Sequence, residues 1–169
     1  MKKFIISIDQ GTTSSRAILF DLKGKPVYSS QKEFTQYFPK SGWVEHNPEE
    51  IWSTTKKTLK DVIIKSKKLK GKILTIGITN QRETTVLWDK KTGKAVYNAI
   101  VWQDRRQEEF CKKLRKQNNE TLIFNRTGLL IDSYFSGIKI KWVLDNVPLA
   151  KKLMNRKQLL FGTIDSFLI

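Results

Sequence analysis

Short apolar runs separated by polar turns open the chain. Phe4–Ile8 and Arg16–Asp21 are rich in Ile and Phe and are bounded by glycine and small hydroxyl residues. This pattern is typical of strands joined by a tight turn. After the turn Lys23–Lys25, the segment Pro26–Phe34 predicts a third, more polar strand. Consecutive strands with such short connections are expected to be antiparallel neighbours.

A long helix is predicted after an irregular loop. Asn47–Glu50 has the signature of a helix start, with a capping side chain, a proline at the first helical position and acidic residues behind it. We expect the loop before it, Thr35–His46, to pack its aromatic side chains on the domain and its lone His46 to lie at the surface. Residues with helical spacing predict one buried stripe on the helix: Ile51, Trp52, Thr55, Leu59, Val62 and Ile63.

The middle of the chain predicts three more strands and a helix. Lys72–Asn80 is a near-continuous apolar run, which favours a strand buried on both faces and parallel to the first strand. Thr85–Asp89 and Ala95–Trp102 predict a strand pair around the turn Lys90–Gly93. Asp104–Gln107 resembles a capping box, which predicts a helix running to about Lys116.

The last third of the chain is mainly helical in pattern. Helical segments are expected near Glu120–Arg126, Gly137–Asn146 and Leu149–Asn155, followed by a strand at Leu159–Thr163. Ile164–Ile169 has the pattern of the opening turns of a helix but contains no cap, glycine or polar tail. We therefore expect residues 1–169 to form one domain that is incomplete at its C-terminal end.

The composition narrows the class of protein. A hydrophobic content of 39% with 11% aromatic residues excludes a disordered chain. The formal net charge of +16 attracts polyanions, so a nucleic-acid-binding module has to be considered. However, the surplus is mostly scattered Lys, without the array of Arg and aromatic residues on one face that such modules use. This favours a solvated, lysine-coated surface, and loss of an acidic half would leave the same imbalance.

Cysteine content and hydropathy indicate the compartment. Cys111 is the only cysteine and cannot form an internal disulfide. The apolar run after Lys2 and Lys3 is too short for a signal peptide, and no stretch approaches the length of a membrane span. We therefore expect a cytoplasmic protein.

The turn between the first two strands is the first candidate site. The first strand ends at the carboxylate of Asp9, and Gly11, Thr12, Thr13 and Ser14 follow it. Backbone N–H groups, hydroxyls and a carboxylate in a small volume can hold a phosphate chain and its Mg²⁺ ion. The alternative is an ordinary β-hairpin with a polar turn, because Asp-x-Gly-Thr alone is a weak signal.

A second group of candidates follows the later strands. Gln81, Arg82 and Glu83 come directly after an apolar strand, where α/β sheets bind ligands, and offer both donors and acceptors to a polyhydroxylated substrate. The alternative is a surface ion pair between Arg82 and Glu83. Trp102 either fills the core or packs on a carbon skeleton. Tyr134, in an aromatic loop before a helix, either donates a hydrogen bond to a ligand or fills the core.

Several stretches together resemble the N-terminal domain of the FGGY family of carbohydrate kinases. They stand in family order over nearly the whole chain: Asp9–Arg16, Gly42–His46, Gly77–Thr85, Tyr97–Gln103, Tyr134–Gly137 and Phe161–Asp165. Other sugar kinases of the family share the phosphate turn. Asn80–Thr85 resembles the glycerol-phosphorylating members in particular.

The resemblance implies a fold and a set of ligands. The fold is an α/β, ribonuclease-H-like (actin-like ATPase) fold with three antiparallel strands, then parallel strands, and helices on both faces of the sheet. Two such domains hold ATP and glycerol in the cleft between them. The roles implied are nucleotide binding by Thr12, Thr13, Ser14 and Arg16, Mg²⁺ binding through water by Asp9, hydrogen bonding to glycerol by Arg82, Glu83 and Tyr134, and packing on its carbons by Trp102.

The resemblance also implies what residues 1–169 lack. A second domain of similar size follows in full-length members and contains the catalytic Asp, part of the glycerol pocket and the adenine site. We therefore assign no catalytic residue here and expect the fragment alone to be inactive in ATP-dependent glycerol phosphorylation. Another sugar kinase of the family and a basic nucleic-acid-binding module are the alternatives. A homo-oligomer and a complementing C-terminal half both stay open as partners.

Overall fold

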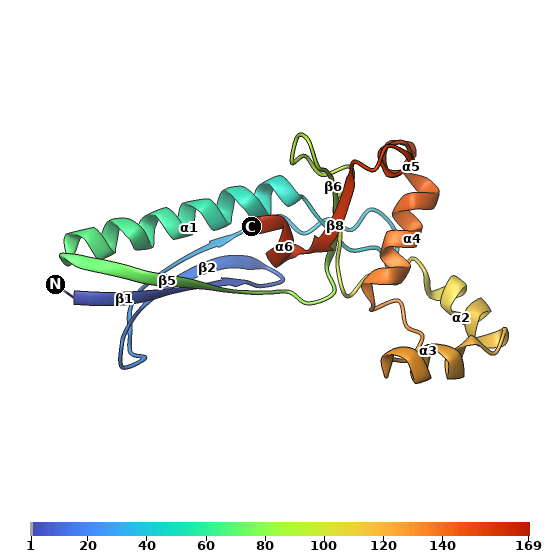
Figure 1. The fold of residues 1–169 in the computed structure, drawn as a ribbon, viewed down its shortest axis with the longest axis horizontal. Coiled ribbons are helices and arrows are strands. Elements are labelled where there is room, and N and C mark those ends of the chain that lie inside the picture. Colours follow the sequence, from blue (N-terminus) through green and yellow to red (C-terminus); the bar gives the residue numbers. More distant parts are fainter. Residues whose placement is uncertain (1) are drawn as a thin grey trace. The chain divides into compact units, whose positions relative to one another are not determined.

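The computed structural model describes residues 2–169, which divide into two compact units (Figure 1). The first unit contains the residues up to Gln36 together with Asn47–Gln81 and Ile164–Ile169. The second unit contains Tyr37–His46 and Arg82–Thr163. Residues far apart in the sequence therefore meet within each unit.

A mixed four-stranded sheet with the order β3-β2-β1-β5 forms the first unit. β1 (Lys2–Gln10), β2 (Ser14–Asp21) and β3 (Pro26–Glu33) are antiparallel neighbours, and β5 (Gly71–Asn80) runs parallel to β1. The three antiparallel strands and the parallel strand beside them were expected from the sequence and are confirmed. The register places the last residues of β1 beside the first residues of β2, on either side of the turn that contains Gly11.

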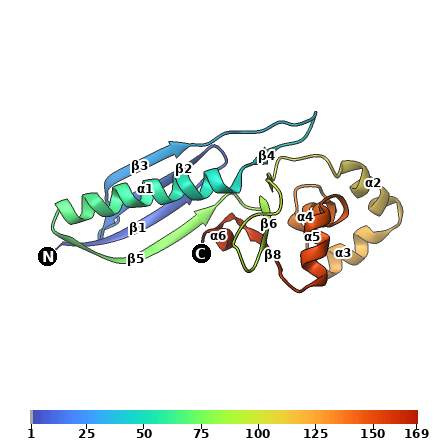
Figure 2. The same ribbon diagram turned by 90° about the horizontal axis from the view of Figure 1, so that it is seen from above.

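Helix α1 (Pro48–Lys68) runs along this sheet (Figure 2). Its predicted start is confirmed, because the Asn47 side chain accepts a hydrogen bond of 2.9 Å from the backbone N–H of Glu49. A short helix, α6 (Ile164–Leu168), contacts β5. Alternate residues of β1 and β2 pack with α1 and form the core of the unit: Phe4, Ile6, Ile8, Ala17, Leu19 and Val62.

Two expectations about the first unit are wrong. β5 is an edge strand of the described sheet, and its Leu74 and Ile76 are exposed, so it is not buried on both faces. An apolar run does not by itself distinguish a central strand from an edge strand. Trp52 is also exposed rather than part of the stripe of α1. The buried residues of this helix recur every three or four positions and leave Trp52 to one side: Pro48, Ile51, Thr55, Thr58, Val62 and Ser66.

An antiparallel sheet with the order β4-β7-β6-β8 organises the second unit. Its strands are β4 (Glu45–His46), β7 (Ala99–Ile100), β6 (Thr85–Asp89) and β8 (Leu159–Thr163). The predicted strand pair is present, although β7 is short and Ala95 only forms an isolated bridge with Trp88. The strand predicted at Leu159–Thr163 is confirmed.

Four helices complete the second unit. They are α2 (Glu108–Lys116), α3 (Asn119–Thr127), α4 (Ser136–Asn146) and α5 (Pro148–Asn155), close to the predicted helical segments. α4 and α5 pack on β6. The core between them contains Leu87, Ile100, Val143 and Ala150.

Three local expectations about this unit are wrong. His46 is completely buried in β4 rather than at the surface. Phe38, in the loop before β4, is exposed rather than packed on the domain. The capping box at Asp104 is not formed, because α2 begins at Glu108 and its N-cap residue, Gln107, makes no side-chain capping bond.

Asp104 belongs instead to a buried charged cluster around Arg106. Nη2 of Arg106 lies 2.7 Å from Oε1 of Glu45 and 2.9 Å from Oδ2 of Asp104, and the Arg106 side chain is only 1% exposed. Its guanidinium lies 3.9 Å from the ring centroid of Trp43 and 4.4 Å from that of Trp142. Of the stretch Gly42–His46, which contributes to the family resemblance, Glu45 and His46 are buried in the second unit, whereas Gly42 is exposed.

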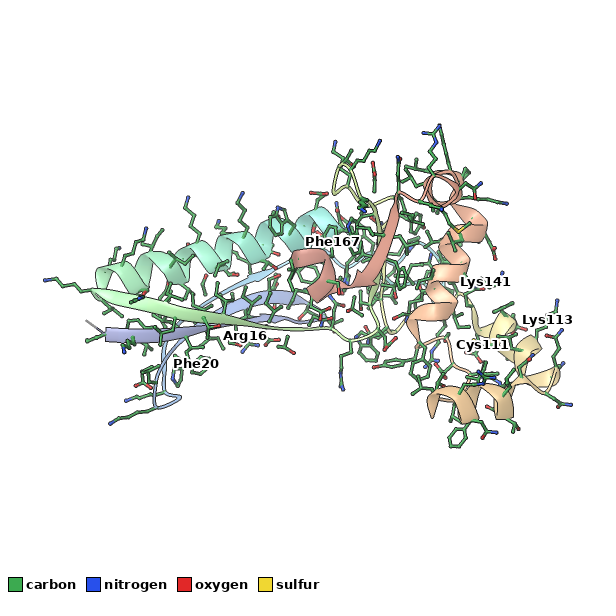
Figure 3. The ribbon with its side chains drawn as sticks, in the orientation of Figure 1. Arg16, Phe20, Cys111, Lys113, Lys141 and Phe167 are labelled. Atoms are coloured by element: carbon green, nitrogen blue, oxygen red, sulfur yellow. The ribbon has the colours of Figure 1, made fainter. Side chains whose placement is uncertain are left out.

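The lysine surplus is visible at the surface of the second unit. Lys113 on α2 and Lys141 on α4 are exposed, whereas Cys111 on α2 is a buried free thiol (Figure 3). Within residues 2–169, no helix combines the length and the apolar character that crossing a membrane requires.

Candidate functional site

The turn between β1 and β2 is fixed through its carbonyl groups. The side chain of Gln81, which follows β5, reaches this turn and also bonds to Gln10 at 3.0 Å. Each carbonyl oxygen from Gly11 to Ser14 accepts a hydrogen bond of 2.8 to 3.3 Å from the first unit. The donors are Gln10 and Gln81 to Gly11, Gln36 to Thr12, the backbone N–H of Phe34 to Thr13, and the backbone N–H of Gly11 to Ser14.

With its carbonyl groups already bonded, this turn is better suited to bind an anion than the turn of an ordinary β-hairpin. Carbonyl oxygens repel phosphate, and the carbonyls from Gly11 to Ser14 all accept hydrogen bonds from protein donors. The turn also contains the hydroxyl groups of Thr12, Thr13 and Ser14. Thr13 is exposed and Thr12 is half-buried. Ser14 is buried, and its hydroxyl accepts a hydrogen bond of 2.8 Å from Gln31, so Ser14 also has a structural role.

Asp9 and Arg16 lie opposite each other across β1 and β2. Nη2 of Arg16 is 3.6 Å from Oδ2 of Asp9, and both side chains are partly exposed (Figure 3 labels Arg16). Among residues 2–169, no group of three or more His, Cys, Asp or Glu side chains is placed to hold a metal ion. A single carboxylate beside a phosphate-type turn fits Mg²⁺, which usually keeps several waters and binds one or two carboxylates plus substrate phosphates.

In the second unit, Glu83 is bound to the start of α4. Its Oε2 accepts hydrogen bonds from the backbone N–H of Ser136 at 2.8 Å and from the Ser136 hydroxyl at 2.6 Å. The neighbouring Arg82 is exposed. The alternative of a mutual Arg82–Glu83 surface ion pair is therefore not what the structure contains, because the carboxylate binds the helix start instead.

Trp102 and Tyr134 come together beside this loop. Their ring centroids are 6.1 Å apart with an edge-to-face angle of 72°, and both residues are half-buried. The backbone N–H of Trp102 also donates to the hydroxyl of Thr84 at 3.3 Å. Since Thr84 follows Glu83 and Tyr134 shortly precedes Ser136, the structure brings Glu83, Trp102 and Tyr134 into one region of the second unit.

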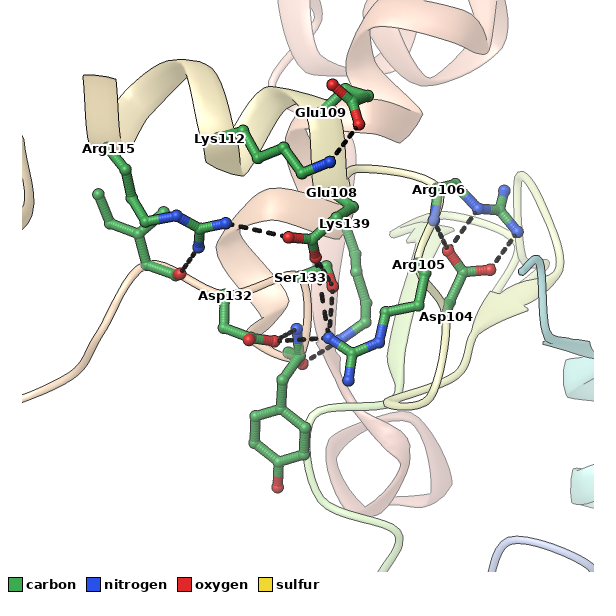
Figure 4. A network of polar contacts seen from close by, with 12 residues as sticks. Asp104, Arg105, Arg106, Glu108, Glu109, Lys112, Arg115, Asp132, Ser133 and Lys139 are labelled. Atoms are coloured by element: carbon green, nitrogen blue, oxygen red, sulfur yellow. Dashed lines mark hydrogen bonds and ion pairs between the residues drawn. The ribbon is translucent and has the colours of Figure 1, made fainter. Parts of the chain in front are cut away.

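The loop that contains Tyr134 is held by ionic contacts that sequence reasoning missed (Figure 4). Oδ1 of Asp132 accepts hydrogen bonds from the backbone N–H of Tyr134 at 2.7 Å and from Arg105 at 3.2 Å. Arg115 donates to the carbonyl of Ile131 at 2.5 Å. These contacts fasten the loop to α2 and to the segment before it, so the ring of Tyr134 has a fixed backbone behind it.

Lys139 on α4 is the other residue that sequence reasoning missed. Lys139, which Figure 4 labels, is 2% exposed, and its Nζ donates to the backbone carbonyl of Glu83 at 3.0 Å and to that of Tyr134. Burial lowers the pKa of Lys139 to about 8, against the opposing effect of nearby carboxylates. The available signal was its spacing, because Lys139 lies four residues before Val143 on the buried stripe of the helix.

The two units thus offer different chemistry. The turn of the first unit contains hydroxyls and one carboxylate, which suit a phosphate chain with a divalent cation. The second unit provides a carboxylate, a phenol and an aromatic face, which suit a short carbon chain with several hydroxyls. The ligand roles that the resemblance implies for these residues stay predictions.

Comparison with known proteins identifies relatives along the entire chain. The family model described as "FGGY family of carbohydrate kinases, N-terminal domain" matches residues 4–169. Glycerol kinases from Alkaliphilus metalliredigens and Oceanobacillus iheyensis are 57% and 58% identical over 169 and 168 residues, which cover 100% and 99% of this chain. In each case the match covers 34% of the relative. The chain therefore spans about a third of the length of these curated relatives.

Solved structures show the same likeness. The crystal structure of Plasmodium falciparum glycerol kinase with ADP matches with a TM-score of 0.92 and 37% identity, over 99% of this chain and 33% of that one. Gluconate kinase from Lactobacillus acidophilus matches with a TM-score of 0.84 and 25% identity, over 100% of this chain and 33% of that one. These matches confirm the fold class expected from the sequence, the actin-like α/β fold.

Proposed function

Because this chain belongs to the FGGY family of carbohydrate kinases, we propose that it is the N-terminal part of an enzyme that phosphorylates glycerol to glycerol 3-phosphate with ATP. The observation that supports this most is the grouping of Glu83, Trp102 and Tyr134 in the second unit. The identity of 57% to a glycerol kinase supports the choice of glycerol among the substrates of the family.

In this proposal the second unit binds the polyol. Oε2 of Glu83 is engaged by Ser136, which leaves Oε1 to accept a hydrogen bond from a glycerol hydroxyl. The exposed Arg82 and the phenol of Tyr134 supply donors, and Trp102 packs on the carbon chain. Charged and polar groups of this kind discriminate strongly for a hydroxylated ligand, because they are left unpaired without it.

The first unit binds the nucleotide phosphates in the same proposal. Thr12, Thr13 and Ser14 provide peptide and hydroxyl donors, and Arg16 adds a guanidinium. Asp9 holds Mg²⁺ through water, and the ion, when bound, neutralises part of the charge on the phosphates. The relative from Plasmodium falciparum, whose structure contains ADP, supports a nucleotide ligand.

We further propose that residues 1–169 alone do not complete the reaction. The chain spans about a third of its relatives, and the resemblance assigns the catalytic Asp and the adenine site to the remaining part. Phosphoryl transfer depends on positioning and charge stabilisation, which require the complete set of ligand contacts. The proposal includes the cytoplasmic location expected from the sequence, and a homo-oligomer or a complementing C-terminal half as possible partners.

The alternatives make different predictions. Another sugar kinase of the family is supported by the similarity to gluconate kinase, but at only 25% identity. The nucleic-acid-binding module is not favoured, because membership in a carbohydrate kinase family accounts for the whole chain.

A chimera tests the proposal. Residues 1–169 replace the matching first third of the Alkaliphilus metalliredigens glycerol kinase, and ADP release is measured with Mg²⁺, ATP and glycerol, xylulose or gluconate. We expect turnover with glycerol, close to that of the unmodified relative, and none from the purified 169-residue chain. Preference of the chimera for a sugar would overturn the choice of glycerol, and glycerol-dependent turnover by the chain alone would overturn the need for a second part.

A further inference from the structure

Lys139 occupies a position where a lysine is costly. It is one of the largest completely buried side chains of the protein, although it lies on a helix of the lysine-coated second unit. Lys141, two residues further along α4, shows the usual arrangement: it is exposed and pairs with Asp145 at 2.6 Å. Burying an ammonium group is unfavourable unless its N–H groups find hydrogen-bond acceptors. The acceptors of Lys139 therefore indicate its structural role.

Those contacts join two of the three segments of the candidate polyol site, which contains Glu83, Trp102 and Tyr134. Nζ of Lys139 donates to the backbone carbonyl of Glu83 at 3.0 Å and to that of Tyr134, and it lies 5.7 Å from the centroid of the Tyr134 ring. Ser136, one helical turn earlier on α4, binds the side chain of the same Glu83. α4 therefore holds Glu83 by its backbone and by its carboxylate.

Glu83 needs this restraint because of its backbone conformation. Its φ of +64° lies in the left-handed region, which residues with a side chain seldom adopt without support from their surroundings. A hydrogen bond from Lys139 to its carbonyl fixes the orientation of the peptide that follows Glu83. The direction of the Glu83 side chain then depends on a cation that lies 56 residues away in the sequence.

We propose that Lys139 is a positioning residue for the polyol site, whose buried ammonium group fixes the backbones of Glu83 and Tyr134 so that both side chains address the same ligand. This inference rests on the proposed function, because it assumes that Glu83 and Tyr134 bind the polyol. Its structural part, the restraint of two loops by one cation, does not depend on the identity of the ligand.

The surroundings of Lys139 make the restraint sensitive to pH. Burial lowers its pKa to about 8, while the carboxylates of Glu83, Asp104 and Asp132 favour its charged form and Arg105 opposes it. Below pH 8 the ammonium form makes charge-assisted hydrogen bonds to the two carbonyls. Above this pH the neutral amine donates more weakly, so polyol affinity is expected to fall as the pH rises through 8.

The first test uses the 169-residue chain without ligand. Lys139→Met removes the donor and keeps an unbranched apolar side chain, Lys139→Gln keeps a neutral donor, and Lys141→Met is the matched control. Backbone amide exchange is followed by mass spectrometry over the segments that contain Glu83 and Tyr134. We expect about ten-fold faster exchange in Lys139→Met, less in Lys139→Gln, and wild-type exchange in Lys141→Met. Wild-type exchange in both Lys139 variants would overturn the restraint.

The second test measures kinetics in the chimera described above. Lys139→Met should raise the KM for glycerol at least about ten-fold with the KM for ATP unchanged. The ratio of the variant and wild-type KM values for glycerol should fall toward one between pH 7 and 9.5, as the wild-type lysine loses its proton. An equal rise of both KM values, or a ratio independent of pH, would show that Lys139 only maintains the fold. If the chimera itself did not use glycerol, the proposed function would fail while the exchange test would still decide the restraint.

Discussion

The two units bury their polar groups in different ways. In the first unit the buried polar residues among those described are neutral: Gln10, Ser14, Ser15, Thr55, Thr58, Ser66 and Gln81. In the second unit they include the charged side chains of Glu45, Asp104 and Lys139, together with the 1% exposed Arg106. Neutral groups that are hydrogen-bonded cost little to bury, whereas each buried charge requires a matched partner.

The two candidate sites differ in the same way, because one is formed by a single segment of the chain and the other by several segments. The phosphate-type turn consists of residues adjacent in the sequence, and amide side chains such as Gln81 only support it from outside. The candidate polyol site combines three separate segments, and charged groups such as Lys139 join them. The contiguous turn is thus supported by hydrogen bonds from neutral groups, whereas the site assembled from distant loops is held by charged groups.

The largest expected effect comes from removing Arg106. Arg106→Met leaves Glu45 and Asp104 buried without their cation, which is expected to cost about 3–5 kcal/mol of unfolding free energy. Chemical denaturation of the chain measures the loss, and amide exchange shows whether it is concentrated in the second unit. Lys112→Met, which removes an exposed pair with Glu109, should change stability by less than about 0.5 kcal/mol. A loss as small as that in Arg106→Met would contradict the contrast between the units.

The next effect concerns the dependence of stability on pH. Burial lowers the pKa of Lys139 in the folded chain to about 8 from its ordinary value of 10.5, so the unfolded chain binds more protons between these two pH values. The contribution of Lys139 to the free energy of unfolding is therefore least favourable below pH 8 and rises as the pH approaches 10.5, by about 3 kcal/mol at about 1.4 kcal/mol for each pH unit of the shift. The rise should appear as a difference between wild type and Lys139→Met in denaturation at each pH. Parallel curves for the two proteins would contradict it.

A smaller effect is expected from the turn of the first unit. In the chimera, Asp9→Asn with Thr13→Val removes a carboxylate and an exposed hydroxyl beside the phosphates, and kcat should fall by about 100-fold. The KM for glycerol should stay near the wild-type value, because the polyol residues belong to the other unit. Asp89→Asn with Thr92→Val removes the same groups from an exposed turn in which their side chains bond at 3.0 Å, and should leave kcat unchanged. Unchanged kcat in the first variant would make the turn an ordinary hairpin.

The smallest effect is expected at Glu83. Glu83→Ala in the chimera should raise the KM for glycerol about ten-fold, because a hydroxyl of the ligand loses its acceptor. Ser136→Ala, which removes one of the two hydrogen bonds to Oε2 and keeps the backbone donor, should have a smaller effect. A wild-type KM in Glu83→Ala would show that this carboxylate only supports the start of α4.

The fold was predictable wherever its signal is local. The first three strands, the capped start of α1 at Asn47 and the last strand at Leu159–Thr163 follow from short-range patterns, and the structure contains them. The environment of each element was less predictable. The sequence predicts β5 as a strand buried on both faces, but β5 lies at an edge of the described sheet. It also predicts Trp52 as part of the buried stripe of α1, but Trp52 is exposed. Exposure depends on which other elements cover a residue, and periodicity does not contain that information.

The family, the order of the elements and the turn from Asp9 to Ser14 could be predicted from local patterns, because these depend on residues that are neighbours in the chain. Which charges are buried, and which loops contact each other, depends on long-range contacts that are present only in the folded chain. Glu83 accepts a hydrogen bond from Ser136, which is 53 residues away in the sequence, and Arg106 donates one to Glu45, which is 61 residues away. A lysine or an aspartate has the same local signal at the surface and in the core. Its role is decided by the partners that folding brings to it, as Asp104 and Lys139 show.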